Sequence, residues 1–295
     1  MRIVVLSPRV APGILTLTAW DALRQASAVH AAEDDPHVRA IIASGIAVDV
    51  SAAPPTYAPD AVWIAPTGDT AWAQSVADDL LGGGGDADVE VIFGSYDLPG
   101  AALLDVVDVM DRLRRECPWT GQQTHQTLSH YLLEEAHETL EALDNGDSEH
   151  LREELGDLLM QIVFHARIAS EAKEIGHSGW DIDDVAAGIS AKLIYRNPHV
   201  FGDAVVTSAE EVDANWQRLK GTEKQRSSPH DGIPATLPAL AYADKVLSRL
   251  DGVDVSGTDL GSRLLALVAE ARAQGQDAEE VLRQAVRQLT GSQSA

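Results

Sequence analysis

Two acidic pairs, each spaced to share one face of a helix, are the residues of this sequence best suited to chemistry. Glu135 and Glu138 are three residues apart, and so are Glu154 and Asp157. In a helix, this spacing puts two carboxylates on one face, about 4.5 Å apart along the axis. Carboxylates arranged in this way can bind a hard divalent cation together.

The residues around the second pair indicate that its carboxylates are buried. An acidic pair in a chain with 46 acids is usually a solvated helix face. Residues 148–175, however, predict a helix that is apolar nearly all round. Like charges in a buried strip cost several kcal/mol unless a cation or a basic side chain offsets them, so we expect one of these two partners. The predicted core stripe is Leu151, Leu155, Leu158, Leu159, Ile162, Val163 and Ala166, with Met160, Phe164 and Ile168 on the far side and Glu154, Asp157, Gln161 and His165 as the remaining polar strip.

The short segment 145–148 predicts that two helices, at 126–144 and 148–175, form an antiparallel hairpin. Glu138 comes shortly before this turn and Glu154 shortly after it, so the two acidic pairs are expected to face each other. Four carboxylates without a thiolate favour Mg²⁺ or Mn²⁺ over Zn²⁺. The first helix has an apolar stripe with Glu135 near its edge, formed by Leu128, Leu132, Ala136, Leu140 and Leu143.

Cations and an aromatic side chain recur at helical spacing further along the chain. Lys192 and Arg196 are four residues apart near the end of a helix predicted at 181–196, and Trp216 and Lys220 have the same spacing in one predicted at 208–220. Two interpretations are open. The basic residues complement a helix dipole and the tryptophan is part of a core, or the cations bind phosphate and the tryptophan stacks on a base.

Three histidines near the first acidic pair, His125, His130 and His137, are expected to be surface or hydrogen-bonding residues. The zinc-protease motif H-E-x-x-H is not completed, because position 141 is a glutamate.

Composition narrows the classes of partner. The chain of 295 residues has 22 basic and 46 acidic side chains and a formal charge of −24. A surface of this charge repels polyanions, so we expect neither nucleic acid nor a membrane as partner. No apolar run approaches the roughly 20 residues of a membrane span, and the N-terminal run is too short for a signal peptide. Cys117 is the single cysteine, which excludes an intramolecular disulfide and a cysteine zinc cage and favours the cytoplasm.

The pattern of elements predicts a mainly α protein with three parts. Residues 1–97 predict a small α/β domain, with strands at 3–6, 38–43, 61–65 and 89–93 and helices at 15–29 and 71–81. Residues 98–222 predict an all-α domain, whose first helix spans 101–115. Residues 223–295 predict a linker, part of a polar stretch from 221 to 238, followed by a helical tail at 239–251 and 258–290.

Several segments together resemble one family. The sequences LEEAHE at 133–138 and REELGDLL at 152–159 resemble the E-E-x-x-E … E-x-x-D signature of the MazG nucleotide pyrophosphohydrolases. The segments CPW at 117–119, QTH at 123–125 and RNPHVF at 196–201 resemble its other markers, although Thr120 and Asn197 depart from them. The N-terminal part resembles a degenerate tetrapyrrole methylase domain. It lacks the glycine-rich turn of that family and is too short, so methyl transfer is not predicted.

The resemblance implies an all-α fold, a homodimer or homotetramer that completes its active sites, and Mg²⁺-dependent hydrolysis of NTPs and dNTPs, including damaged ones, to monophosphate and pyrophosphate. Mn²⁺ is the expected substitute. Two alternatives remain: a narrower enzyme acting on dUTP, dCTP or phosphoribosyl-ATP, and a non-catalytic oligomerisation module. By motif position, the resemblance implies Glu135, Glu138, Glu154 and Asp157 as metal ligands, Glu134 and Glu153 as catalytic residues near the attacking water, and Tyr131, Lys192, Arg196, Trp216 and Lys220 as nucleotide contacts.

Overall fold

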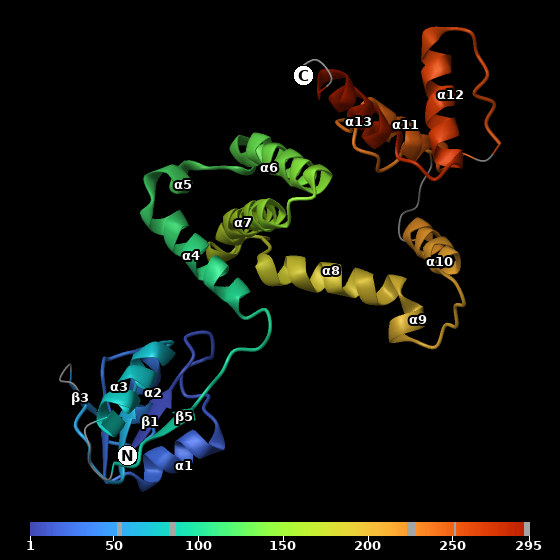
Figure 1. The fold of residues 1–295 in the computed structure, drawn as a ribbon. Helices are drawn as coiled ribbons and strands as arrows, with labels where there is room; N and C mark the ends of the chain where they lie inside the picture. The colour runs from blue at the N-terminus through green and yellow to red at the C-terminus, as the bar shows by residue number, and fades with distance from the viewer. Residues whose placement is uncertain (52–54, 83–86, 223–227, 251, 292–295) are drawn as a thin grey trace. The chain divides into compact units, whose positions relative to one another are not determined.

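The computed structural model describes residues 1–51, 55–82, 87–222, 228–250 and 252–291 (Figure 1). The chain divides into two compact units, residues 1–187 and 188–295, which are treated in turn. The described residues contain thirteen helices and one five-stranded sheet, which confirms the predicted mainly α fold. Among these residues, none of the helices combines the length and the apolar character that crossing a membrane requires.

The first unit begins with a three-layer α/β domain. Its sheet is parallel throughout, in the order β3-β2-β4-β1-β5. Residues alternate across β1, so that Val4 packs towards α1 and α2 while Ile3 and Val5 pack towards α3 (Figure 1). The elements are β1 (Arg2–Val5), α1 (Leu17–Gln25), β2 (Ala28–Ala31), α2 (Pro36–Ala43), β3 (Asp49–Val50), β4 (Ala61–Ile64), α3 (Thr70–Gly82) and β5 (Glu90–Phe93).

Two predictions for this domain are wrong. The strand predicted at 38–43 is the helix α2, because Asp35 accepts the backbone N–H of Val38 at 2.8 Å and Pro36 occupies the first turn. The helix predicted at 15–29 ends at Gln25, and Val29 belongs to β2. The strands predicted near 3–6, 61–65 and 89–93 and the helix near 71–81 are confirmed.

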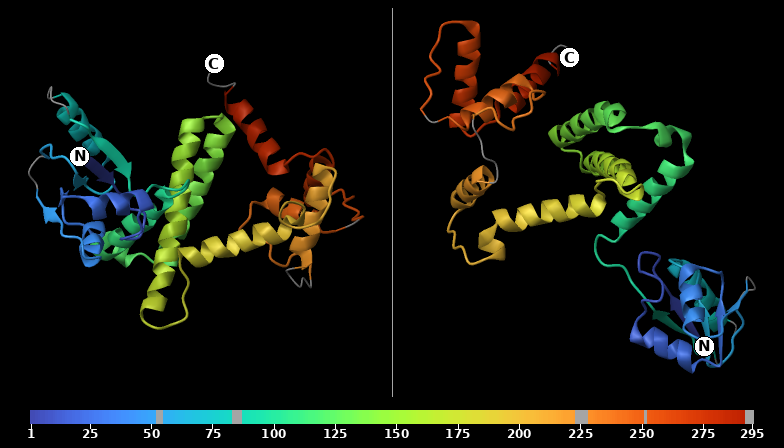
Figure 2. Two further views of the ribbon diagram at one scale, coloured as in Figure 1. Left: turned by 90° about the horizontal axis from the view of Figure 1, so that it is seen from below. Right: turned by 180° about the vertical axis from the view of Figure 1, so that it is seen from behind.

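A helical part completes the first unit with α4 (Ala102–Glu116), α5 (Pro118–Gln122), α6 (His125–Asn145) and α7 (Ser148–Glu174). Helices α6 and α7 lie side by side as the predicted antiparallel hairpin (Figure 2). Gly146 ends α6 with φ 68°, a left-handed conformation that glycine adopts readily, and Asp147 caps α7. Met110, Leu128, Val163 and Phe164 form the core that joins α4 to the hairpin.

Helices make up the rest of the chain. α8 (Ile182–Arg196) spans the division between the units, and α9 (Pro198–Phe201), α10 (Ala209–Thr222), α11 (Ala239–Leu247), α12 (Leu260–Ala273) and α13 (Ala278–Gly291) follow. The single helix predicted at 258–290 is two helices, because Asp277 accepts the backbone N–H groups of Glu279 and Glu280 and starts α13 anew. Of the predicted linker, residues 223–227 lie outside the described residues. The predicted domain boundaries stay a prediction.

Candidate metal centre

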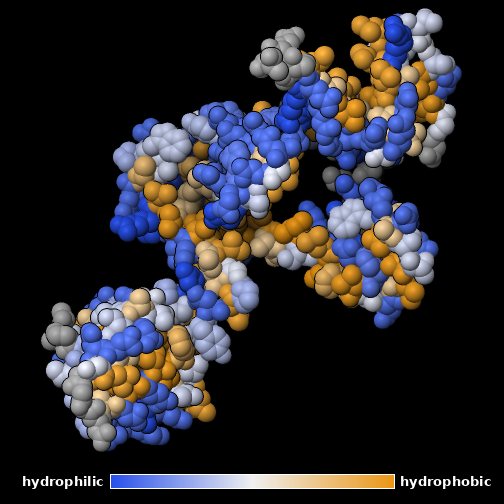
Figure 3. Space-filling view, in the orientation of Figure 1, coloured by the Kyte–Doolittle hydropathy of each residue, from blue (hydrophilic) through white to orange (hydrophobic). Residues whose placement is uncertain are grey.

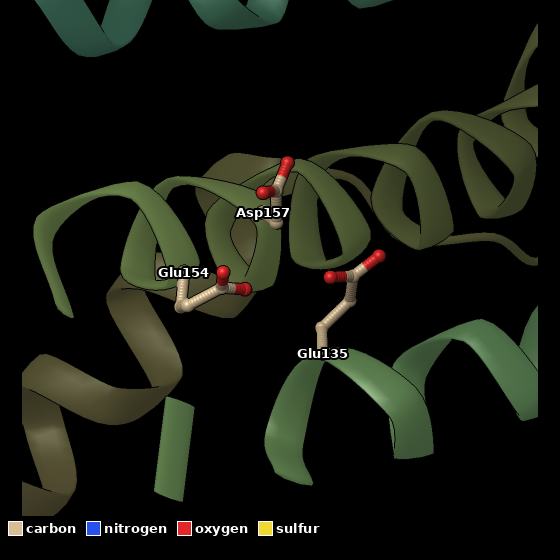
Figure 4. Close-up of side chains that lie close together, drawn as sticks. All are labelled: Glu135, Glu154 and Asp157. Atoms are coloured by element: carbon tan, nitrogen blue, oxygen red, sulfur yellow. The ribbon is translucent and has the colours of Figure 1, made fainter. Parts of the chain in front are cut away.

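Three carboxylates from the two helices of the hairpin converge on one point. Glu135 comes from α6, and Glu154 and Asp157 come from α7. Each offers one oxygen, and these three oxygens all lie within 4.8 Å of one another. Figure 4 shows the three side chains directed into the space between the helices. The hairpin therefore assembles an oxygen-only ligand set of the kind that hard divalent cations prefer.

The structure brings together three of the four predicted metal ligands. Glu138 lies outside this group of oxygens and is exposed on α6. The negative charge of Glu138 still acts on the cluster, because it contributes to raising the pKa of Glu135. It therefore adds negative potential to the site in this structure without adding an oxygen to the group.

Glu154 is the most deeply buried of the three carboxylates, with 7% of its surface exposed. Its Oε1 lies 2.8 Å from His150 Nε2, within ion-pair distance. Its Oε2 is buried and has no hydrogen-bond partner within the protein. An unpaired buried carboxylate oxygen is costly, and a cation bound between the three carboxylates would offset that cost. The sequence predicted that the buried acids of α7 need a cation or a basic side chain as partner. His150 is a basic partner of Oε1, and a cation would fit at Oε2.

The electrostatics of the cluster disfavour three unneutralised charges. Burial raises the pKa of Glu135 above its usual range, and the neighbouring charges of Asp157, Glu138 and Glu154 raise it further. A divalent cation reverses this effect, because it favours the ionised form of each ligand. The residues present thus fit a Mg²⁺-type ion on both donor chemistry and charge.

The other residues predicted near the cluster lie around it on the hairpin. Glu134 and Glu153 are exposed and each is adjacent in sequence to a member of the group. Tyr131 is half-buried one turn before Glu135. Its ring lies with its centroid 3.8 Å from that of His130 and makes an edge contact with Trp119 at 6.1 Å. Tyr131 therefore belongs to a small group of neighbouring rings from α5 and α6.

The remaining predicted nucleotide contacts belong to the second unit. Lys192 is exposed on α8. The Arg196 guanidinium lies over the Trp216 ring, 5.4 Å from its centroid, and Trp216 is half-buried. Lys220 lines a polar cavity of about 670 Å³ in this unit, with Lys245, Arg249 and Arg272 among the other lining residues. The structure thus brings Arg196 and Trp216 together, as a cation–π pair.

The predicted core stripes are partly wrong. On α7, Phe164 is buried, whereas Leu155 and Ile162 are about half exposed. On α6, Leu128 is buried but the rest of the stripe is not, since Leu132, Leu140 and Leu143 are exposed. The physical reason is that α4 packs on the Phe164 side of the hairpin, which leaves the opposite side of α7 uncovered by the described residues of the first unit.

Two polar pairings in the structure were not predicted from the sequence. The first is His150 with Glu154, which the i, i+4 spacing on α7 could have revealed. The second is His125 with His165, whose Nδ1 atoms lie 2.7 Å apart and whose rings stack. No local spacing indicates this second pair, because the residues come from different helices. It agrees with the expectation that His125 is a hydrogen-bonding residue.

The helical hairpin with its three converging carboxylates defines an all-α class of proteins. Within that class, residues 123–201 match the family described as the MazG nucleotide pyrophosphohydrolase domain. The chain belongs to the MazG family.

The chain is also similar in sequence to several known proteins. The chain is 47% identical to an uncharacterized 26.1 kDa protein of Streptomyces cacaoi. The alignment covers 70% of this chain and 88% of that protein. The chain is 42% identical, over 64% of its length, to the nucleoside triphosphate pyrophosphohydrolase of Mycolicibacterium smegmatis, and spans 57% of that protein. It is 41% identical, over 53% of its length, to the protein of the same name from Escherichia coli K12, and spans 60% of it. The chain thus covers less than two thirds of these two named enzymes.

Proposed function

We propose that this chain hydrolyses nucleoside triphosphates, ribo- and deoxyribonucleotides alike, to the nucleoside monophosphate and pyrophosphate. The observation that carries the proposal is the buried, unpartnered Oε2 of Glu154 beside the carboxylates of Glu135 and Asp157. The names of the relatives from M. smegmatis and E. coli support the substrate class. A role in removing unwanted nucleotides, damaged ones included, follows from a substrate range of this breadth.

The proposed cofactor is Mg²⁺, with Mn²⁺ as a substitute. Glu135, Glu154 and Asp157 would hold the cation, and Glu138, on the same face of α6 as Glu135, would join them once the substrate is bound. The bound cation would neutralise negative charge on the triphosphate, which explains how a chain of formal charge −24 can accept such a substrate.

In the proposed reaction, a water oxygen attacks the α-phosphorus, and the bond from this phosphorus to the α,β-bridging oxygen breaks. Pyrophosphate leaves with the electron pair of that bond, and the water proton passes to a carboxylate. Glu134 or Glu153 would accept the proton, since each is exposed and lies next to a residue of the cluster.

The nucleoside and the phosphates need contacts beyond the carboxylates. Following the motif positions of the family, we assign these to Tyr131, Lys192, Arg196, Trp216 and Lys220. The stacking of Arg196 on Trp216 supports this assignment, because it combines a cation for phosphate with an aromatic face for a base.

We also propose that the chain acts as a homodimer or homotetramer. Support comes from apolar side chains that are exposed on the hairpin, namely Leu133, Leu143, Leu155 and Ile162. Figure 3 shows that apolar side chains lie on the surface of the helical part beside charged ones. Light scattering should give a mass above that of one chain, and Leu155→Asp should lower it. A wild-type chain that is monomeric at all concentrations would refute oligomerisation.

Product analysis with a panel of nucleotides and Mg²⁺ tests the activity. The expected products are monophosphate and pyrophosphate; diphosphate with inorganic phosphate would contradict the proposal. Glu154→Gln and Asp157→Asn should abolish pyrophosphate release while the helical circular dichroism is kept. The matched control is Glu149→Gln, because Glu149 is an exposed acid of the same helix, paired with Arg152. Retained activity in either cluster variant would remove that residue from the mechanism.

A further inference from the structure

We propose that His150 is a positioning residue of the metal site, which holds Glu154 so that one defined oxygen is left for the cation. The inference rests on the proposed function, because it concerns the same cluster. His150 stands one turn before Glu154 on α7, and its Nε2 lies 2.8 Å from Glu154 Oε1. In the proposed arrangement, the imidazole Nε2 donates a hydrogen bond to this oxygen, because a carboxylate oxygen can only accept one.

The proposed hydrogen bond would restrict the rotation of the Glu154 carboxyl group. The terminal torsion of a glutamate carboxyl group is broad and roughly two-fold, so either oxygen could turn towards Glu135 and Asp157. With Oε1 held by His150, only Oε2 remains, and this is the atom without a protein partner. The two observations therefore complement each other on one carboxyl group.

His150 is itself held by the start of the helix. Asp147 Oδ1 accepts the backbone N–H groups of Glu149 and His150, each at 3.1 Å. This cap fixes the backbone of the first turn of α7, from which the imidazole reaches towards Glu154. The imidazole is more exposed than its partner, since 40% of its side chain is accessible compared with 10% for Glu154. A half-exposed side chain thus controls the orientation of a buried ligand.

The arrangement suits a small cation. Mg²⁺ requires a near-octahedral shell and keeps several waters, so each carboxylate of the cluster would supply a single oxygen. A glutamate with one oxygen already engaged can supply only the other. Hydrogen bonds that orient a metal ligand in this way typically contribute about 10- to 100-fold to metal affinity.

The test measures Mn²⁺ binding to the full chain by electron paramagnetic resonance, independently of turnover. The informative pair is His150→Met and His150→Gln, because both are good helix formers with no ring to titrate, and only glutamine keeps an N–H donor. His150→Met should weaken Mn²⁺ binding about tenfold or more, and His150→Gln should recover most of the loss. His177→Met, which changes an exposed histidine near the far end of α7, is the matched control and should bind like the wild type.

The possible outcomes distinguish the proposed metal site from the proposed positioning role of His150. A wild-type chain that binds no Mn²⁺ refutes the proposed metal site and, with it, this inference. A wild type that binds Mn²⁺ while His150→Met binds equally well, or more tightly, refutes the positioning role alone. A loss of binding that His150→Gln does not restore also refutes it, because the proposed hydrogen bond would then not explain the loss.

Discussion

Replacement of Glu135 by glutamine should stabilise the cation-free protein while weakening its response to Mg²⁺. The side chain contributes one of three carboxylate oxygens that lie within 4.8 Å of one another. Without a cation these charges repel, so removing one relieves two close repulsions. With a cation the same charge becomes a favourable ligand, and its loss becomes costly.

The magnitude follows from Coulomb's law. Two like charges about 4 Å apart repel by ~1 kcal/mol in water and by ~4 kcal/mol at an effective dielectric constant of about 20. Glu135 is partly exposed, so solvent screening keeps each repulsion near the lower value. Two repulsions then amount to about 1 to 2 kcal/mol, which corresponds to a rise in melting temperature of about 2 to 8 °C.

The pH dependence of stability has a definite sign. The pKa of Glu135 is raised from its ordinary 4.5, chiefly by burial and then by Asp157, Glu138 and Glu154. The folded chain therefore binds this proton more tightly than the unfolded chain does. The cation-free wild type should lose stability as the pH rises from the ordinary value through the raised one, whereas Glu135→Gln should not. The stabilisation by the substitution is thus largest above that window.

The assay is thermal unfolding followed by circular dichroism, near neutral pH, first with EDTA and then with Mg²⁺. A ligand at about 100 times its dissociation constant adds ~2.7 kcal/mol of stability, so Mg²⁺ should raise the melting temperature of the wild type well above that of the variant. Glu149→Gln serves as control, because it removes the same charge from an exposed position on α7.

Two results would contradict this prediction. If Glu135→Gln melts at or below the temperature of the cation-free wild type, the carboxylates do not repel one another as their spacing requires. If Mg²⁺ stabilises the wild type and the variant equally, Glu135 is not a ligand.

Three further predictions concern other parts of the molecule. The pKa of His165 is lowered, chiefly by burial, so the stability present above its ordinary 6.5 should be lost as the pH falls through the lowered value, and His165→Gln should reduce that loss in urea titrations. Arg114→Met should cost about 2 to 3 kcal/mol of unfolding free energy, because the guanidinium donates to both oxygens of Glu171 and to two backbone carbonyls; equal urea midpoints would disprove this. Gly94→Ala should destabilise the α/β domain by about 1 to 3 kcal/mol, because a Cβ there would lie 2.6 Å from the Leu6 side chain; hydrogen exchange in the sheet measures this, and unchanged protection would contradict it.

Local sequence determined the parts of this protein that depend on neighbours along the chain. The hairpin follows from the Gly146 and Asp147 caps between two helical segments, and the pairing of Glu154 with Asp157 on one face follows from helix geometry. The same kind of local signal corrects the misread helix α2, since the Asp35 cap and Pro36 were present in the sequence and outweigh its β-branched residues.

Only the tertiary structure decided which faces meet. The periodicity of α7 gave its polar strip but could not tell that Phe164 packs inward while Leu155 stays exposed, because helix rotation depends on where α4 and α6 pack. The tertiary structure also decided that Glu135, and not Glu138, joins Glu154 and Asp157 in the group of three close carboxylates. The physical reason is that helix spacing relates residues within one helix, whereas distances between helices depend on side-chain packing from segments far apart in sequence.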